Sequence, residues 1–327
     1  MTMKTSTLLV IVLFLLCSQF AGAQQPKVHR LGILMIGDPT QPMLKGLRDG
    51  LKDSGYIEGK NLILEISAKE TFDELRPLAE SYKVRKLDVI VTVGGTATTI
   101  AKESTREIPI VFVSVNDPVQ LGLVKLLARP DTNVTGVAVH ADAEMQGKRL
   151  EIFKEVAPTL RRLAVLYNAR GENPNHAKNL AFIRKLAPML RLTLTEKPVK
   201  SAADLDQALS SISKNQTDGI FILCTNLLRA PFKKIAAAAI QKRLALIGCD
   251  AEQVSEQGAL LSYDSDRYRM GQRGAWYVDR VLKGAKPQEL PIETPMYFEL
   301  VISLKTAKQI GVTIPPNVLA RAVKVIK

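Results

Sequence analysis

The chain has 327 residues, which is long enough for two domains that each bury a hydrophobic core. Its hydrophobic content of 46% and charged content of 24% are typical of a folded globular protein and exclude disordered and fibrous classes. The formal net charge of +13 would suit nucleic acid or an anionic membrane, but the Lys and Arg residues are spread over the predicted helices without a long basic tract. We therefore expect no nucleic-acid partner.

The first 23 residues have the pattern of a secretory signal peptide. Lys4 supplies the positive start, Leu8 to Leu16 is an unbroken apolar run, and a small-residue cleavage site ends at Ala23. The apolar run is too short to cross a bilayer as a stable anchor. We therefore expect cleavage near Ala23 and a mature protein in the periplasm.

An alternative is a lipoprotein acylated at Cys17. Two leucines precede Cys17, where a small residue would be expected, so simple cleavage is preferred. The mature chain then keeps Cys224 and Cys249. These cysteines could pair in an oxidising compartment, but both lie in or just after apolar runs, where buried thiols are common. We expect two buried free thiols.

The first half of the mature chain alternates between strand-like and helix-like segments. Apolar runs that can be buried on both faces, separated by helices, indicate a parallel sheet with helices on both sides. The predicted strands are Leu31–Ile36, Asn61–Ile66, Asp88–Val93, Pro109–Val113 and Val134–Val139, and the predicted helices follow Pro42, cover Phe72 to Tyr82, and run from Gly94-Gly95-Thr96 to Ser104.

One stretch of this half marks a ligand site. The apolar run before Asn116-Asp117-Pro118 stops where Pro118 disfavours helix at the preceding residue, so short polar side chains are left at the carboxyl end of a strand. Open α/β sheets bind ligands at this edge. We expect a helix to start after Pro118 and to contain or adjoin Gly122.

The pattern restarts after residue 139, which indicates a second sheet. The predicted helices include Glu144–Ala157, one beginning at Ser201 with a capping box, and Phe232–Lys242. The predicted strands are Leu163–Tyr167, Leu192–Thr195, Gly219–Leu223 and Leu244–Ile247.

The C-terminal part predicts a return to the first lobe. A short strand at Ala259–Ser262 is followed by a long helix, Tyr268–Leu282, then by a strand at Tyr297–Ile302 and a last helix. This order predicts several hinge segments between two Rossmann-like lobes that close over a ligand. The expected lobes are residues 24–138 with 264–288, and residues 139–263 with 289–327.

Catalytic and metal-binding motifs are missing from the mature sequence. It contains no nucleophile elbow, no phosphate-binding P-loop and no dinucleotide fingerprint. His29, His140 and His176 share no ligand spacing with each other or with the cysteines. We expect a protein that is not an enzyme and that uses no metal or cofactor.

Polar residues recur at the carboxyl ends of strands in both halves. Amides at the start of a helix could hold a carboxylate, and Asp117 or Asp250 could hold an ammonium group, so an amino acid is a suitable ligand. The alternative is that these residues are helix caps and turn residues. Trp276 lies mid-helix and is expected in the core. The candidate ligand-binding residues are Gly95, Thr96, Ala97, Asn116, Asp117, Asn168, Thr225, Asn226, Asp250 and Tyr263.

Several segments together resemble the substrate-binding proteins of ABC transporters, in the family that includes tryptophan and other aromatic amino acid binders. The resemblance covers nearly all of the mature chain, although Asp131-Thr132 stands where the family often has Gly-Gly. It rests on the segments from Gly50 to Asn61, Asp88 to Thr92, Ile108 to Val119, Gly122 to Val124, Asn133 to Gly136, Gly147 to Glu151, Leu282 to Pro287, Lys305 to Gly311 and Ile314 to Pro316.

The resemblance implies a type I periplasmic-binding-protein fold and delivery of a small solute to an inner-membrane ABC permease. We expect a monomer. Two other functions are compatible with the same fold: a receptor read by a membrane signalling protein, and a periplasmic enzyme, which the missing catalytic motifs disfavour. A sugar-type transcription regulator is disfavoured because a signal peptide stands where DNA-binding helices would be.

Overall fold

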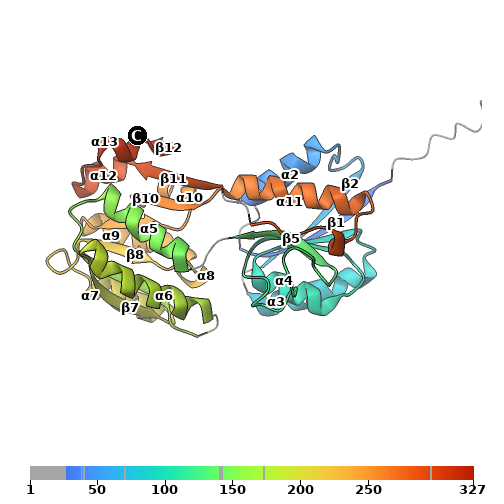
Figure 1. Ribbon diagram of the computed structural model, residues 1–327, viewed down its shortest axis with the longest axis horizontal. Coiled ribbons are helices and arrows are strands. Elements are labelled where there is room, and N and C mark those ends of the chain that lie inside the picture. The colour runs from blue at the N-terminus through green and yellow to red at the C-terminus, as the bar shows by residue number, and fades with distance from the viewer. Residues whose placement is uncertain are drawn as a thin grey trace, which may run out of the picture.

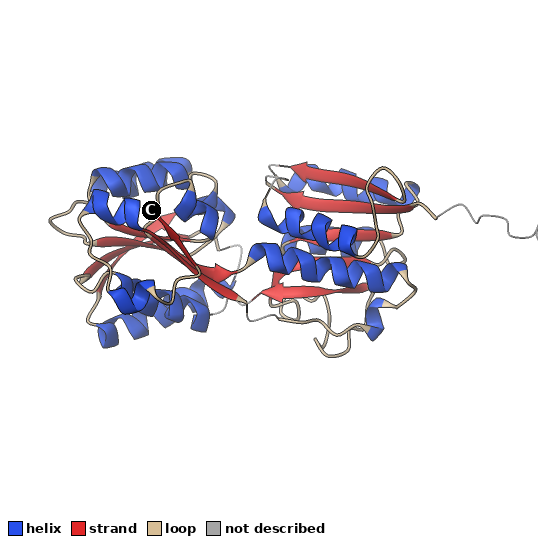
Figure 2. Cartoon of the chain, turned by 90° about the horizontal axis from the view of Figure 1, so that it is seen from above, coloured by secondary structure: helices blue, strands red, loops and turns tan. Residues whose placement is uncertain are grey.

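The chain folds into two α/β lobes that lie side by side (Figures 1 and 2). The predicted two-lobed α/β architecture is confirmed. The predicted signal peptide lies outside the described residues, and none of the helices within those residues is long and apolar enough to span a membrane. The computed structural model describes residues 27–37, 39, 41–69, 71–139, 143–171, 174–294 and 297–327.

The first lobe is built on a five-stranded sheet in which all neighbouring strands are parallel, with the order β2-β1-β3-β4-β5. Its strands are mostly apolar on both faces, as a sheet covered by helices on two sides requires. The strands are β1 (His29–Ile36), β2 (Leu62–Lys69), β3 (Val89–Val93), β4 (Ile110–Asn116) and β5 (Val134–Val139).

Helices cover both faces of this sheet. Val91 and Val113 point to the face covered by α2 and α11, whereas Ile90 and Phe112 point to the face covered by α3 and α4, because successive residues of a strand alternate sides. The helices are α2 (Pro42–Asp53), α3 (Phe72–Ser81), α4 (Gly95–Ser104) and α11 (Arg267–Leu282), with short 3₁₀ helices at η2 (Tyr82–Val84) and η4 (Pro287–Glu289).

The helices α2 and α11 are far apart in the sequence but lie side by side on the first lobe (Figure 1). Glycines allow their backbones to touch. A Cβ atom on Gly46 would lie 2.0 Å from the carbonyl oxygen of Tyr268, and one on Gly271 would lie 1.9 Å from the carbonyl oxygen of Met43. The predicted return of the C-terminal part to the first lobe is thus built on direct helix-to-helix backbone contact.

The second lobe has a seven-stranded sheet with the order β12-β11-β10-β9-β8-β6-β7. Its neighbouring strands are parallel, as predicted, except β10 and β11, which are antiparallel. β11 is reversed because the chain re-enters the lobe from the first lobe. The strands are β6 (Arg162–Asn168), β7 (Thr193–Val199), β8 (Gly219–Ile222), β9 (Ala245–Gly248), β10 (Leu261–Ser265), β11 (Phe298–Ser303) and β12 (Lys324–Ile326).

Helices also cover both faces of the second sheet. The predicted cap at Ser201 is confirmed, since its side chain accepts a hydrogen bond from the Asp204 amide while Asp204 accepts one from the Ser201 amide. The helices are α5 (Ala143–Val156), α6 (Pro174–Leu186), η3 (Ala187–Leu190), α7 (Ala202–Ser211), α8 (Asn226–Arg229), α9 (Phe232–Gln241), α10 (Ala251–Ser255), α12 (Leu304–Ile310) and α13 (Pro316–Leu319).

The chain passes between the lobes after β5, after β10 and before β11. The segment before β11 stays with the first lobe beyond the expected boundary at residue 288. Leu290 and Ile292 pack into the cores of that lobe, and the Ala138 amide donates a 2.7 Å hydrogen bond to the carbonyl oxygen of Glu293. The hinge segments therefore run next to one another between the two sheets.

The expected helix after Pro118 does not form. The chain instead makes turns, in which the Leu121 amide donates to the carbonyl oxygen of Asp117 at 3.1 Å and the Leu123 amide donates to that of Pro118 at 2.9 Å. Gly122 has φ of +66°, which interrupts a right-handed helix. The segment after β4 is therefore a loop.

Candidate functional site

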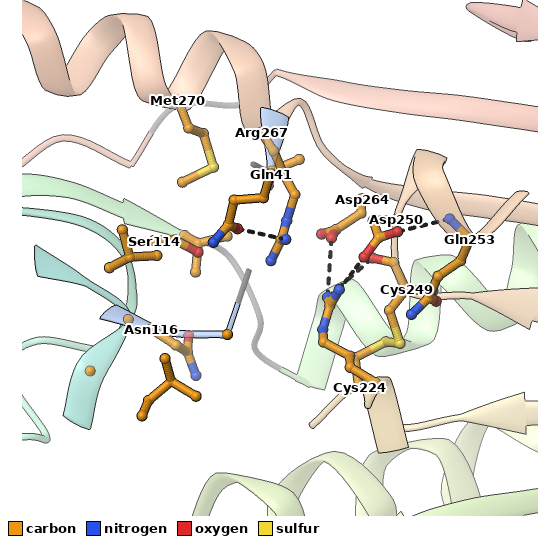
Figure 3. A pocket seen from close by; sticks show the side chains of 18 of the residues that line it. Gln41, Ser114, Asn116, Cys224, Cys249, Asp250, Gln253, Asp264, Arg267 and Met270 are labelled. Atoms are coloured by element: carbon orange, nitrogen blue, oxygen red, sulfur yellow. Dashed lines mark hydrogen bonds and ion pairs between the residues drawn. A yellow bond between two sulfur atoms is a disulfide. The ribbon is translucent and has the colours of Figure 1, made fainter. Parts of the chain in front are cut away.

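A cavity of about 570 Å³ lies between the two lobes, at the carboxyl ends of strands from both sheets (Figure 3). Its first wall comes from the loop after β1, the start of α4 and the end of β4. Its second wall comes from α5, α6 and the loops after β8 and β9, and the start of α11 closes one side. This position and size suit a small molecule that contacts both lobes.

The N-terminus of α4 presents backbone donors to the cavity. Gly94 is the residue before the helix and has φ of +83°. Within the described residues, the amides of Gly95, Thr96 and Ala97 have no hydrogen-bond acceptor, as expected for the first turn of a helix. These three residues line the cavity. Their free donors and the helix dipole favour a negatively charged group.

The end of β4 contributes two polar side chains, those of Ser114 and Asn116. The pairing of β4 with β5 shifts register between Val113 and Val115, and Ser114 has φ of +63°. Such a bulge re-aims a side chain at the edge of a sheet. Both residues lie at the first wall in Figure 3.

Asp117, the next residue, does not line the cavity. It is exposed, and its Oδ1 atom accepts a 2.9 Å hydrogen bond from the amide of Gln120. Its carboxylate therefore fixes the turn after β4. This is the turn role that the sequence left open as an alternative to ligand binding.

Arg149 of α5 joins two strands of the second lobe at the cavity floor. Its Nη1 atom donates to the carbonyl oxygen of Ile222 and its Nη2 atom to that of Gly248, both at 2.9 Å. The side chain is 2% exposed, and burial lowers the pKa of Arg149 to about 10, so it stays protonated at neutral pH. It thus holds the ends of β8 and β9 together and leaves a buried positive charge at the cavity.

Arg229, at the end of α8, forms an ion-pair group with Asp250 and Asp264, the two aspartates labelled in Figure 3. It contacts Asp250 directly and lies 3.7 Å from Oδ2 of Asp264. Asp250 is also the cap of α10, because its Oδ1 atom accepts a 3.0 Å hydrogen bond from the Gln253 amide. Both oxygens of Asp250 are therefore engaged, whereas Asp264 keeps capacity to bind a further donor.

Burial perturbs the charged groups near the hinge. Desolvation raises the pKa of Asp264, although the Arg229 and Arg267 guanidinium groups oppose this effect. Desolvation also lowers the pKa of Arg267, with the positive charge of Arg229 acting in the same direction. Each group would be stabilised in its charged form by an opposite charge placed in the cavity.

A disulfide joins Cys224 and Cys249, so the expectation of two free thiols is wrong. The residues follow β8 and β9, which are paired in the sheet, and their Cα atoms are 5.7 Å apart, within the range that a disulfide spans. Sequence reasoning missed this because adjacency of the two strand ends is a property of the sheet order. Both cysteines line the cavity, where the bridge ties the Arg229 loop to the Asp250 loop.

Removing this disulfide is expected to destabilise the second lobe. The double variant Cys224→Ala with Cys249→Ala should lose about 2–4 kcal/mol of unfolding free energy, because the bridge restricts the unfolded chain. Denaturant titration with and without dithiothreitol measures this loss. The reductant should shift the wild-type curve and leave the double variant unchanged. Two titratable thiols in the unreduced mature protein would contradict the assignment.

The structure brings together part of the predicted site. Gly95, Thr96, Ala97, Asn116 and Asp250 line one cavity, whereas Asp117, Asn168, Thr225 and Tyr263 are not in its lining. The side chain of Asn226 lies outside the described part of the chain.

The predicted residues outside the lining have structural contacts. The Asn168 Oδ1 atom accepts from the Arg170 amide at 2.9 Å, and the Thr225 carbonyl oxygen accepts from the Leu228 and Arg229 amides at 3.1 and 2.9 Å. Tyr263 stacks on Phe298 with ring centroids 5.6 Å apart and packs on the core of the second lobe. Trp276 is half-buried on α11 and packs against the first-lobe core.

Sequence reasoning missed several lining residues, above all Arg149, Arg229, Asp264 and Arg267. The sequence holds a signal for Arg149: it lies on the same face of its helix as Phe153, so a charge falls on an apolar stripe. The others carry no such signal, because their loops meet only when the lobes face each other. No cluster of three or more His, Cys, Asp or Glu residues in the described chain could hold a metal ion.

Comparisons with known proteins agree with this geometry. A tyrosine-binding protein of Clostridioides difficile is 26% identical over 265 residues, covering 81% of this chain and 75% of that protein. A conserved domain protein of Vibrio cholerae is 30% identical, with a TM-score of 0.79 over 91% of this chain and all of the other. An ABC domain from Streptococcus pneumonia in complex with L-Trp is 23% identical, with a TM-score of 0.80 over 92% of this chain and all of the other.

Two α/β lobes around a central cavity are the arrangement of the type I periplasmic-binding-protein fold. The family of ABC transporter substrate binding proteins matches residues 33–326, and this chain belongs to it. The protein is therefore an extracytoplasmic substrate-binding protein of an ABC transport system, and the family implies delivery of the solute to a membrane permease.

Proposed function

We propose that the protein binds an amino acid in the cavity between its lobes and delivers it, without turnover, to an inner-membrane ABC permease. The proposal rests on one observation: the same cavity is lined by donors that suit a carboxylate and by an acidic side chain that suits an ammonium group. The free amides of Gly95, Thr96 and Ala97 suit a carboxylate, and Asp264 faces them from the second lobe. Relatives named for binding tyrosine and L-Trp support the same class of ligand.

The ammonium group of the ligand is assigned to Asp264 rather than to Asp117 or Asp250. Asp117 is exposed outside the cavity, and both oxygens of Asp250 are engaged. Burial disfavours the charged form of Asp264 in the free protein, so a bound ammonium would recover that cost. Asn116 supplies a further polar contact from the first lobe.

The proposed setting is the periplasm, where the mature chain acts as a monomer and binds no nucleic acid. The Cys224–Cys249 disulfide supports an oxidising compartment. A ligand that contacts both lobes would favour the closed arrangement over the open one. The closed arrangement is the form that a permease would recognise.

A thermal-shift screen tests the proposal. Protein starting at Gln24 is mixed with the twenty amino acids and with small carboxylates, sugars and purines. A ligand in hundredfold excess over its Kd stabilises the folded state by about 2.7 kcal/mol, so an amino acid should raise the midpoint by several degrees. The proposal fails if sugars or purines raise the midpoint and no amino acid does, or if the bound solute is chemically converted.

Replacing Asp264 with Asn should weaken binding of the amino acid found in that screen by about 10–100-fold, because a charged hydrogen bond contributes about 1.5–3 kcal/mol. Asp117→Asn removes the same charge outside the cavity and is the matched control. Isothermal titration calorimetry on both variants measures the difference. Equal affinities for the two variants would reject the assignment of Asp264.

A further inference from the structure

The cavity is lined by polar and charged side chains together with aliphatic ones, among them Val93, Met145 and Met270, and within the described residues it presents no aromatic side chain besides one histidine. No Phe, Tyr or Trp lies among the described residues of its lining, and His176 is the only ring there. Tyr263, the aromatic residue expected from sequence to contact a ligand, packs against Phe298 instead. An aromatic ligand would find apolar contact in this cavity but, among the described lining residues, no Phe, Tyr or Trp ring to pack against.

The positive charges of the cavity differ in how they are compensated. Arg229 pairs with Asp250 and Asp264. Arg149 donates to carbonyl and amide oxygens, with no carboxylate at ion-pair distance within the described residues. Arg267 is the one of the three that sits at the hinge, at the first position of α11. The charge of Arg229 is therefore compensated by two aspartates. The charge of Arg267 is not taken up by an ion pair within the described residues and can bind an anionic group of a ligand.

Most of the hydrogen-bond donors of the Arg267 side chain are unused within the described residues. In the described chain, its side chain forms one hydrogen bond, from Nη1 to the Oε1 atom of Gln41 at 3.3 Å, and no ion pair. Gln41 comes from the first lobe and holds the guanidinium group at the edge of the cavity (Figure 3). A guanidinium group has five N–H donors in a fork that matches a carboxylate, so most of them remain for a ligand.

Ser265 provides independent evidence for a ligand beside Arg267. Its side chain is 3% exposed and lines the cavity, and its Oγ atom has no hydrogen-bond partner within the described residues. A buried hydroxyl without a partner is costly, and a ligand oxygen would satisfy it. Ser265 precedes Arg267 by two residues, so both donors lie at the same hinge.

We propose that Arg267 binds a second carboxylate of the ligand, so that the solute is an acidic amino acid such as L-glutamate or L-aspartate. This inference rests on the proposed function, in which α4 takes the first carboxylate and Asp264 the ammonium group. Arg267 is then the residue that selects the side chain of the solute. A basic amino acid is the competing ligand, because the carboxylates of Asp264 and Glu252 also line the cavity.

Calorimetry on the mature wild-type protein tests the ligand class. L-Glutamate and L-aspartate are compared with their amides, L-glutamine and L-asparagine, which have nearly the same shape without the second charge. One acid should bind at least tenfold more tightly than its amide, and more tightly than L-tryptophan, L-tyrosine, L-arginine or L-lysine. Tighter binding of an amide, an aromatic or a basic amino acid overturns this inference and leaves the proposed function standing. Binding of no amino acid overturns both.

The variant Arg267→Gln tests the residue. It should reduce the ratio of acid to amide affinity to about one, while Arg269→Gln, on the same turn of α11 but paired with Asp266 at the surface, should keep the wild-type ratio. Circular dichroism confirms that both variants fold. An unchanged ratio in folded Arg267→Gln would overturn the role of this residue. The wild-type comparison decides the ligand class even if the variant does not fold.

Discussion

Replacing Gly271 with alanine is expected to unfold or severely destabilise the protein, with a loss of about 3 kcal/mol or more of unfolding free energy. The added Cβ atom would lie 1.9 Å from the carbonyl oxygen of Met43 and 2.8 Å from the amide nitrogen of Leu47. Both atoms belong to the backbone of α2, so no side-chain rotation can relieve the clash and the two helices have to separate. Urea denaturation followed by circular dichroism measures the loss.

The matched control is Arg269→Ala, an exposed position on the same helix. It should cost about 1 kcal/mol or less, because its ion pair with Asp266 lies at the surface. A Gly271→Ala protein with wild-type stability would show that α2 and α11 do not approach as closely as described. The variant should also weaken ligand binding, since this helix pair carries Gln41 and Arg267 to the cavity.

Replacing Thr96 with aspartate is expected to abolish ligand binding without destabilising the fold. Thr96 is exposed to the cavity at the second position of α4, where a carboxylate side chain can reach the free amides of the first turn. An acidic residue here stabilises a helix by about 0.3–1 kcal/mol, yet it would occupy and repel the site assigned to the ligand carboxylate. Affinity should fall by a factor of about 100 or more while the unfolding midpoint stays constant or rises.

The control places the same charge at the same position of another helix. Ala203 is exposed at the second position of α7, outside the cavity lining. Ala203→Asp should leave ligand affinity unchanged and should not lower the unfolding midpoint. Tight ligand binding by folded Thr96→Asp would exclude the N-terminus of α4 as the anion site. Calorimetry with the ligand of the wild-type protein provides the readout for both variants.

Local sequence patterns predicted most of the fold. The apolar run predicted as the strand Pro109–Val113 forms β4, and the alternation that restarts after residue 139 predicted the second sheet. The helix predicted at Tyr268–Leu282, expected to return to the first lobe, is α11. These features follow from periodicity over short stretches, which a sequence displays directly. The prediction of a helix after Pro118 was wrong. It relied on a local proline signal, whereas the path of the loop gives Gly122 a positive φ that a right-handed helix does not allow.

The site was less visible in the sequence. Gly95, Thr96 and Asn116 were found because strand ends and helix starts are local features, and the loops of parallel strands meet at one edge. Asp117 and Asp250 are of the residue type that binds an ammonium group, but the Asp117 carboxylate fixes a turn and the Asp250 carboxylate caps α10. The sequence could not separate a cap from a ligand because the same side chains suit both roles.

By itself, the sequence determined the two α/β lobes, the return of the C-terminal helix to the first lobe and the N-terminal turn of α4. Tertiary structure alone decided that Cys224 pairs with Cys249, that Asp264 faces the cavity and that Arg267 keeps unused donors there. The physical reason is that each of these depends on the order of strands in a sheet or on the apposition of two lobes. Such neighbours are remote in the chain, so no local pattern records them.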